Sequence, residues 1–216
     1  MSYKPRNRVQ TRVVTGRRVA SVLVAVLLAT SAWFAYETYF VKPAPEYATV
    51  YTTKGSFEIE LFPAAAPATV ANFVNLADSG FYNDQVWHRI FPGLLIQTGD
   101  PNTRGGLTNR STWGVGGSSQ TVPLEIDRSL HNYQGYVGMA RKEANNSGTS
   151  QFYINLSNST LNRSLDGNYT VFGKVVSGWS VVQSIADVPT YAYGLKFAGQ
   201  PIDPVFVNVI VISKSP

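Results

Sequence analysis

The segment spanning residues 86–98 places one arginine and one glutamine among apolar residues, on either side of a Pro-Gly step. Its halves, residues 86–90 and 94–98, have the composition of short β-strands, and a Pro-Gly pair is typical of a tight turn. This pattern predicts that Arg89 and Gln97 lie close together on one sheet surface. A guanidinium is always charged and carries five donors in a rigid fork, so it needs partners or a function. From this segment alone, pairing with a carboxylate at the sheet edge is the commoner explanation.

Strand and turn signals recur along the chain. Phe57, Ile59 and Leu61 alternate with glutamates, so residues 47–53 and 56–62 are predicted to form an opening hairpin with one buried face. Further strands are predicted at residues 135–140, 151–155, 171–176 and 205–212. Many short strands with few helices predict a mainly β fold, a closed antiparallel barrel capped at its ends.

Two helices are predicted to cap the barrel. Pro67 suits the first position of a helix, apolar residues follow at helical spacing through Ala77, and Gly80 suits its end. A second, shorter helix is predicted at residues 180–186. Residues 99–122 are rich in glycine and lack a regular pattern, which predicts a long surface loop that is functional or mobile.

Composition excludes several classes of function. The chain has no cysteine, so disulfides, thiol catalysis and zinc-thiolate sites are excluded. His88 and His131, the two histidines, lie far apart without ligand spacing, and we therefore predict no metal site. The formal charge of +5 is concentrated in residues 1–42, which hold seven of the 18 Lys and Arg but one of the 13 Asp and Glu. The remainder is near neutral, so we predict no nucleic-acid partner.

An apolar segment near the N-terminus predicts a membrane anchor. Residues 19–36 carry no charge, are rich in Val, Leu and Ala, and end in a cluster of aromatic residues. Six basic residues and no acidic residue precede them, which predicts a cytoplasmic N-terminus and an extracytoplasmic domain at the cell membrane. A cleaved signal peptide is the alternative, because small residues at 29–32 suit a cleavage site. The predicted organisation is a basic cytoplasmic tail, a single-pass transmembrane signal anchor, a short linker and one folded domain, at residues 1–18, 19–40, 41–46 and 47–216.

Three further motifs connect the first segment to a known family. They are Gly-Met-Ala-Arg at residues 138–141, Thr-Ser-Gln-Phe-Tyr-Ile-Asn at 149–155 and Tyr-Thr-Val-Phe-Gly-Lys-Val at 169–175. Together with residues 86–98, and in this order and spacing, they resemble the cyclophilin family of peptidyl-prolyl cis-trans isomerases over about residues 47–213. The resemblance implies eight barrel strands, a monomeric domain, proline-containing polypeptides as partners and catalysis without a cofactor.

Isomerisation of an X-Pro bond must overcome a barrier of about 18–20 kcal/mol that arises from amide resonance. A catalyst needs a pocket for the proline ring, groups that fix the neighbouring backbone, and a donor for the proline nitrogen as it becomes pyramidal. The resemblance makes Arg89 the catalytic donor, and a donor engaged only in the twisted state binds the transition state preferentially. It assigns the proline pocket to Leu94, Leu95, Tyr153, Leu165 and Tyr169, the groove for the preceding residues to Ala140 and Arg141, and orientation of the arginine or binding of the substrate backbone to Gln97 and Gln151.

The chain departs from the family's usual pattern at several positions. Leu94 and Tyr153 stand where the family usually has phenylalanine, and Arg141 replaces a common asparagine. Many members carry a tryptophan that is important for cyclosporin binding. Ser164 stands there in this chain, or Thr160 if the gap is placed differently. We expect catalysis to tolerate such changes better than drug affinity does.

Two other functions fit the sequence less well. A serine hydrolase is excluded because no Gly-x-Ser-x-Gly elbow is present and neither histidine has an evident serine and carboxylate partner. A non-catalytic peptide-binding or chaperone module on the same fold stays open, since such a groove could bind proline-containing chains without isomerising them. The combination of Arg89, Gln97 and Gln151 favours the enzyme, which would assist protein folding at the outer face of the membrane.

Overall fold

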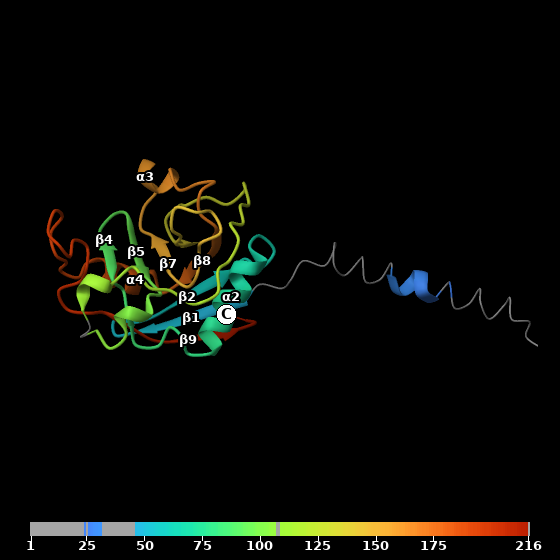
Figure 1. The fold of residues 1–216 in the computed structure, drawn as a ribbon, viewed down its shortest axis with the longest axis horizontal. Coiled ribbons are helices and arrows are strands. Elements are labelled where there is room, and N and C mark those ends of the chain that lie inside the picture. Colours follow the sequence, from blue (N-terminus) through green and yellow to red (C-terminus); the bar gives the residue numbers. More distant parts are fainter. Residues whose placement is uncertain (1–23, 25, 32–45, 107–108, 216) are drawn as a thin grey trace, which may run out of the picture. The chain divides into compact units, whose positions relative to one another are not determined.

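The computed structural model of the protein describes residues 24, 26–31, 46–106 and 109–215 (Figure 1). The chain divides into two units, Met1–Lys42 and Pro43–Pro216, and the described residues of the first unit are helical. No helix in the described part of the chain combines the length and the apolar character needed to cross a bilayer. The predicted cytoplasmic tail, the linker up to residue 45 and most of the predicted anchor lie outside the described residues, so they stay predictions.

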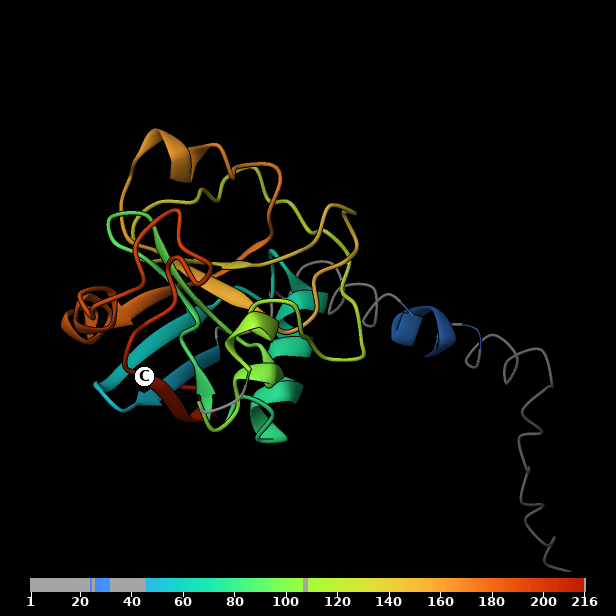
Figure 2. The ribbon, with the colours of Figure 1, turned by 60° about the vertical axis from the view of Figure 1, so that its left-hand side comes forward.

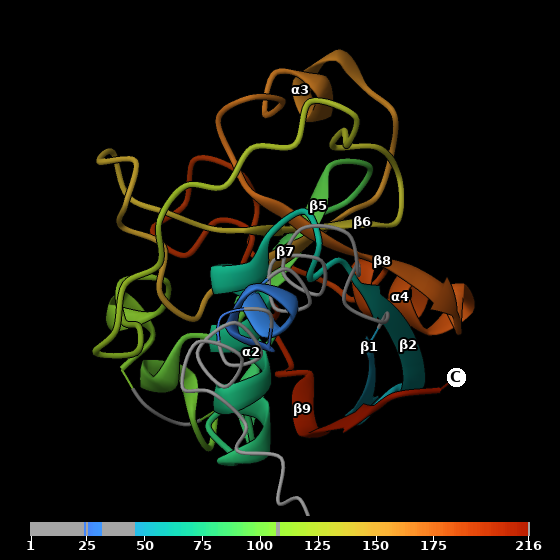
Figure 3. The ribbon, with the colours of Figure 1, turned by 90° about the vertical axis from the view of Figure 1, so that its right-hand side faces the viewer.

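The second unit is built on one curled antiparallel sheet (Figure 3). Its strands are β1 (Glu46–Thr52), β2 (Gly55–Leu61), β3 (Gln85–Val86), β4 (Arg89–Phe91), β5 (Leu95–Thr98), β6 (Tyr136–Met139), β7 (Phe152–Asn155), β8 (Val171–Ser177) and β9 (Phe206–Ser213). Their order across the sheet is β3-β9-β1-β2-β8-β6-β7-β5-β4. The predicted opening hairpin is β1 with β2, in which Val50 pairs with Phe57 and both side chains are buried.

In the part of the chain that the structure describes, the sheet differs from the predicted closed barrel of eight strands, because it has nine strands and its edge strands do not pair with each other. The segment predicted as one strand at residues 86–90 forms β3 and β4, which lie at opposite edges: β3 pairs with β9, and β4 pairs with β5. The ladder breaks at Trp87 and His88, whose side chains are both buried. The two edge strands, β3 and β4, therefore follow each other in the chain. Among the described strands no ladder pairs β3 with β4, and the sheet curls around its core without closing through that pair.

Helices α2 (Pro67–Asp78) and α4 (Trp179–Ala186) form where the sequence pattern predicts them. Proline occupies the first turn of α2, where its missing N–H costs nothing. The backbone N–H groups of Ala68 and Thr69 donate to the Glu125 carboxylate, both at 2.9 Å, which places a negative charge at the positive end of the helix dipole. The apolar face of α2, including Val70 and Phe73, is buried in the core.

An aromatic cluster fills the inside of the curled sheet. The ring of Phe152 on β7 meets Phe73 of α2 and Trp87 edge-on, at centroid distances of 5.4 and 5.9 Å. Phe172 on β8 lies 5.3 Å from Phe73. Such pairs contribute about 0.5–1.5 kcal/mol each beyond the burial of their surface. The cluster fixes the chain crossing between β3 and β4, and hence the backbone from which Arg89 projects.

Two connections carry short helical turns. The described residues of the glycine-rich loop predicted at residues 99–122 are irregular apart from the 3-10 turns η1 (Pro101–Thr103) and η2 (Arg110–Thr112) and a β-bridge at Val122. One turn of helix, α3 (Thr160–Arg163), was not predicted, because a single turn leaves no apolar periodicity in the sequence. Figure 2 shows α3, in orange, standing away from the sheet within the connection from β7 to β8.

Candidate active site

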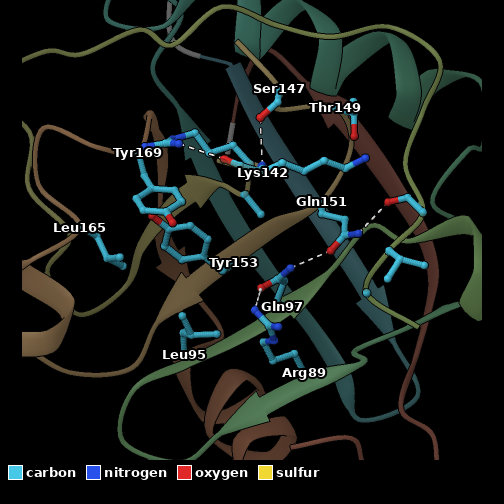
Figure 4. A pocket seen from close by; sticks show the side chains of 15 residues that line it. Arg89, Leu95, Gln97, Lys142, Ser147, Thr149, Gln151, Tyr153, Leu165 and Tyr169 are labelled. Atoms are coloured by element: carbon cyan, nitrogen blue, oxygen red, sulfur yellow. Dashed lines mark hydrogen bonds between the residues drawn. The ribbon is translucent and has the colours of Figure 1, made fainter. Parts of the chain in front are cut away.

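An open cleft of about 350 Å³ lies where β4, β5 and β7 meet the loops around them (Figure 4). Nine of the ten predicted site residues line it, and only Leu94 does not. The lining residues are Arg89, Leu95, Gln97, Gly114, Val115, Gly116, Ala140, Arg141, Lys142, Ser147, Thr149, Gln151, Tyr153, Leu165 and Tyr169.

Strand β5 presents alternate side chains to the cleft. Leu95 and Gln97 line the cleft, whereas Ile96 and Thr98 are buried on the other face of the strand. Leu94 belongs to the turn between β4 and β5, outside the alternation of the strand, and it is not among the residues that line the cleft. Its backbone carbonyl instead accepts a hydrogen bond from Nδ2 of Asn162, at 2.9 Å. The predicted contribution of Leu94 to the proline pocket stays a prediction.

A line of hydrogen bonds leads to Arg89. The carbonyl of Gly116 accepts from Nε2 of Gln151 at 2.7 Å, and Oε1 of Gln151 accepts from Nε2 of Gln97 at 2.7 Å. Oε1 of Gln97 then accepts from Nη1 of Arg89 at 3.5 Å (Figure 4). Both glutamines are buried, and Arg89 stands directly opposite Gln97 in the ladder of β4 and β5. Among the described residues the Arg89 guanidinium makes this one hydrogen bond, so most of its five donors stay available.

The far end of this line is fixed by Asp100, which is fully buried. Its Oδ2 accepts from the backbone N–H of Gly114 at 2.5 Å and of Gly116 at 3.2 Å, and its Oδ1 accepts from the N–H of Asn102 at 2.8 Å. A Cβ on Gly116 would lie 2.2 Å from Oδ1 of Asp100, so only glycine allows this approach. Asp100 thereby fixes the loop whose carbonyl orients Gln151.

One end of the cleft is apolar. Leu95 and Leu165 face it together with the rings of Tyr153 and Tyr169, which meet edge to face at a centroid distance of 6.0 Å. Tyr153 is buried, and its hydroxyl donates to Oδ1 of Asn132 at 2.8 Å. Burial, together with Tyr169 and a nearby acidic group, raises the pKa of Tyr153 well above its ordinary value, so this hydroxyl stays a protonated donor.

Arg141 connects two walls of the cleft. Its Nε donates to the carbonyl of Asn168 at 2.7 Å, and its Nη1 donates to two carbonyls of the segment that follows it, at 2.9 and 2.8 Å. The guanidinium carbon lies 4.9 Å from the centroid of the Tyr169 ring, within range of a cation-π interaction. Arg141 therefore ties the segment after β6 to the loop that carries Tyr169.

The histidine next to Arg89 is neutral at pH 7. His88 is buried, and its pKa is lowered to about 4: burial is the main cause, the Asp100 carboxylate opposes it, and the charge of Arg89 adds to the lowering. His88 therefore adds no second cation beside the guanidinium. In the part of the chain that the structure describes, no three His, Cys, Asp or Glu side chains are grouped so that they could hold a metal ion. The arrangement suits an apolar ring next to a planar amide, with a cationic donor held beside that amide.

Sequence reasoning missed the residues that enclose the cleft from two loops. Gly114, Val115 and Gly116 belong to the glycine-rich loop, and three polar residues, Lys142, Ser147 and Thr149, follow β6. The glycines were the available signal, because a buried carboxylate can approach a backbone this closely only where no side chain intervenes. The polar segment after β6 carries no comparable signal.

A family model and individual relatives indicate the same protein family for this chain. Residues 47–210 match the family described as cyclophilin type peptidyl-prolyl cis-trans isomerase/CLD. Peptidyl-prolyl cis-trans isomerase A of Dickeya dadantii is 32% identical over 200 residues, which cover 92% of this chain and 98% of that protein. A peptidyl-prolyl cis-trans isomerase of Acinetobacter baylyi is 34% identical over 197 residues, which cover 89% and 95%.

Solved structures agree with these relatives. The crystal structure of a cyclophilin type isomerase from Cryptosporidium parvum aligns with a TM-score of 0.68 at 29% identity, covering 80% of this chain and 99% of that one. A second structure of the same protein, in the presence of the dipeptide Ala-Pro, aligns with a TM-score of 0.67 at 28% identity and covers 77% and 98%.

Proposed function

Because this chain belongs to the cyclophilin-type peptidyl-prolyl cis-trans isomerases and is an isomerase of X-Pro bonds, we propose that Arg89 is the group that stabilises the twisted prolyl amide. The observation that carries the proposal is the line of hydrogen bonds from Gly116 through Gln151 and Gln97, which holds the guanidinium beside the apolar end of the cleft. A donor fixed in advance stabilises developing lone-pair density without reorganising during the reaction.

The electronic change during isomerisation explains why a cation is the useful group. Twisting the X-Pro bond breaks amide resonance, which makes up the barrier of about 18–20 kcal/mol, and returns the lone pair to the proline nitrogen. The planar ground state offers no such lone pair. An N–H of Arg89 aimed at that nitrogen is therefore satisfied only as the amide twists, and this is preferential binding of the transition state.

The other lining residues take supporting parts in this proposal. The apolar end, with Leu95, Leu165, Tyr153 and Tyr169, would receive the proline ring. Binding the ring leaves the acyl group before it as the part that rotates. Ala140 and Arg141 would line the groove for the residues before the proline, and Gln97 would orient Arg89. The Ala-Pro dipeptide used with the Cryptosporidium parvum protein has the chemistry that such a pocket requires.

The proposal is tested by Arg89→Ala. Loss of one donor to the transition state lowers kcat/KM by about a hundredfold or more in a protease-coupled isomerisation assay. Arg89 is exposed, so the fold should be unaffected. Arg128→Ala removes an exposed arginine that does not line the cleft, and it should retain the parent activity. A folded Arg89→Ala variant that isomerises as fast as the parent contradicts the proposed role.

We further propose that the N-terminal apolar segment anchors the isomerase to the cell membrane, with the enzyme on the outer face. The supporting observations are the uncharged residues 19–36 and the excess of basic residues before them. Protease added outside intact cells should then digest the isomerase domain while residues 1–18 stay protected. Protection of the whole domain would contradict this orientation, and a mature N-terminus near residue 33 would replace the anchor with a cleaved signal peptide.

A further inference from the structure

A buried polar side chain lies directly behind the apolar end of the cleft. Asn132 is fully buried, in the segment just before β6. Its Oδ1 accepts a hydrogen bond from the hydroxyl of Tyr153 at 2.8 Å and another from Nδ2 of Asn155 at 3.2 Å. Since Tyr153 lines the cleft from β7, Asn132 reaches one wall of the pocket from behind.

The same residue also reaches the opposite wall. The backbone N–H and Nδ2 of Asn132 both donate to Oδ1 of Asp166, at 2.7 and 3.1 Å. The other oxygen of Asp166 lies 3.0 Å from Nδ1 of His131. Asp166 directly follows Leu165 in the loop that also carries Tyr169. Leu165 and Tyr169 both line the cleft. These contacts to Asp166 therefore hold that loop against the segment at 131–132.

The hydroxyl of Tyr153 has little freedom to find another partner. A Cβ on Gly138 would lie 2.2 Å from Cζ of Tyr153 and 2.3 Å from its hydroxyl oxygen, so the ring occupies the slot that the glycine leaves. A buried hydroxyl without a partner is costly. The tyrosine thus depends on two features of its surroundings, the bare backbone at Gly138 and the acceptor on Asn132.

We propose that Asn132 is a positioning residue of the isomerase, which fixes Tyr153 and the loop of Leu165 relative to each other and so sets the shape of the proline pocket. The inference rests on the proposed function, because it takes the apolar end of the cleft as the proline site. Asn132 touches neither Arg89 nor the glutamines through any hydrogen bond of the described residues. Its loss should therefore weaken peptide binding while the rate of isomerisation on the enzyme is maintained.

The test is a double-mutant cycle on the full-length protein with Asn132→Ala and Tyr153→Phe. NMR titration with a peptide that contains Ala-Pro gives Kd, and exchange spectroscopy at saturation gives the rate on the enzyme. We expect Asn132→Ala to raise Kd by about tenfold, as for one lost buried hydrogen bond, with the rate within about twofold of the parent. Adding Tyr153→Phe to Asn132→Ala should raise Kd little further, because the bond that links them is already lost.

A matched control separates positioning from general loss of stability. Thr52→Val removes a buried hydroxyl that donates to the Gly55 carbonyl at 2.7 Å in the turn between β1 and β2, away from the cleft. It should lower the melting temperature and leave Kd unchanged. Should Asn132→Ala fail to fold, Asn132→Asp keeps the acceptor for Tyr153 but sets a second carboxylate against Asp166, and it should raise Kd as well.

Three outcomes overturn the proposal. They are an unchanged Kd in a folded Asn132 variant, a rate on the enzyme that falls as much as the affinity, and effects of the Asn132 and Tyr153 substitutions that multiply independently. None of these results bears on Arg89. If Arg89→Ala is inactive while the Asn132 variants bind normally, the proposed function stands and the positioning role alone is wrong.

Discussion

Gln97→Leu is the substitution that best separates the orienting role of Gln97 from the catalytic role proposed for Arg89. Leucine is close in size to glutamine and leaves β5 in register, but it removes both hydrogen bonds of the Gln97 amide. The bond to Arg89 is 3.5 Å long, at the outer limit for a hydrogen bond, so its own energy is small. We therefore expect kcat/KM to fall by about two- to tenfold, well short of the hundredfold expected for Arg89→Ala.

The effect on stability follows from the other bond of Gln97. Nε2 of Gln97 donates to Oε1 of Gln151 at 2.7 Å, and both side chains are buried. Gln97→Leu leaves that oxygen without its partner, which costs about 2 kcal/mol and lowers the melting temperature by about 4–8 °C for a domain of this size. Replacing both glutamines by leucine removes both members of this pair, which is often close to neutral, although the Gly116 carbonyl then loses its hydrogen bond from Gln151, so only part of the stability returns.

For the double variant we therefore expect different outcomes for stability and for activity. Compared with Gln97→Leu alone, Gln97→Leu with Gln151→Leu should recover part of the melting temperature and none of the activity. Thermal unfolding followed by circular dichroism and the protease-coupled assay measure the two quantities on the same samples. Parent activity in the folded double variant would refute the reasoning, since Arg89 would then need no orienting partner. An activity loss in Gln97→Leu as large as that in Arg89→Ala would also refute it, because Gln97 would then do more than orient.

Two further predictions concern acid stability and drug binding. The folded-state pKa of His88, about 4, lies below the ordinary 6.5, so the unfolded chain takes up this proton first as the pH falls. The contribution of His88 to the free energy of unfolding is complete above pH 6.5 and is lost toward pH 4, by about 3 kcal/mol. Chemical denaturation of His88→Gln should therefore show a smaller fall in the free energy of unfolding over this pH range. Cyclosporin should inhibit the enzyme about ten- to a hundredfold more weakly than it inhibits members with the rim tryptophan, because neither Ser164 nor Thr160, both exposed, offers the aromatic surface and the indole donor. Nanomolar inhibition of the unmodified protein would contradict this, and inhibition should be strengthened by Ser164→Trp or by Thr160→Trp, whichever position faces the drug.

The elements with a clear period were predictable from the sequence. The alternation of Phe57, Ile59 and Leu61 with glutamates gave β2, and the helical spacing after Pro67 gave α2. The pairing of Arg89 with Gln97 followed from the tight turn between their strands, since a short hairpin fixes its own register. These features depend on local geometry, which the sequence encodes directly.

The features that failed depend on distant partners. The strand expected through Trp87 and His88 breaks because their side chains are needed in the core, where Trp87 meets Phe152 of β7. Such a contact joins residues far apart in the chain and leaves no local signal.

The loop that holds Gln151 shows the same limit. Asp100 follows β5 directly, and nothing in its immediate sequence indicates that it binds the backbone of Gly114 and Gly116. The density of glycines in the loop predicted a long surface loop, but not which group its backbone approaches. Asn132 gave no signal at all, because its partners, Tyr153 and Asp166, lie on other elements.

The measurement that tests the central claim most directly is the rate of cis-trans exchange of an Ala-Pro peptide bound to saturation, compared between the parent and Arg89→Ala by NMR. Saturation removes affinity from the comparison, so the exchange rate reports the stabilisation of the twisted amide alone. The account predicts that the rate on the enzyme falls by about a hundredfold or more while Kd changes by less than about fivefold. An unchanged exchange rate with a weakened Kd would show that Arg89 only binds the planar peptide, and it would contradict the account.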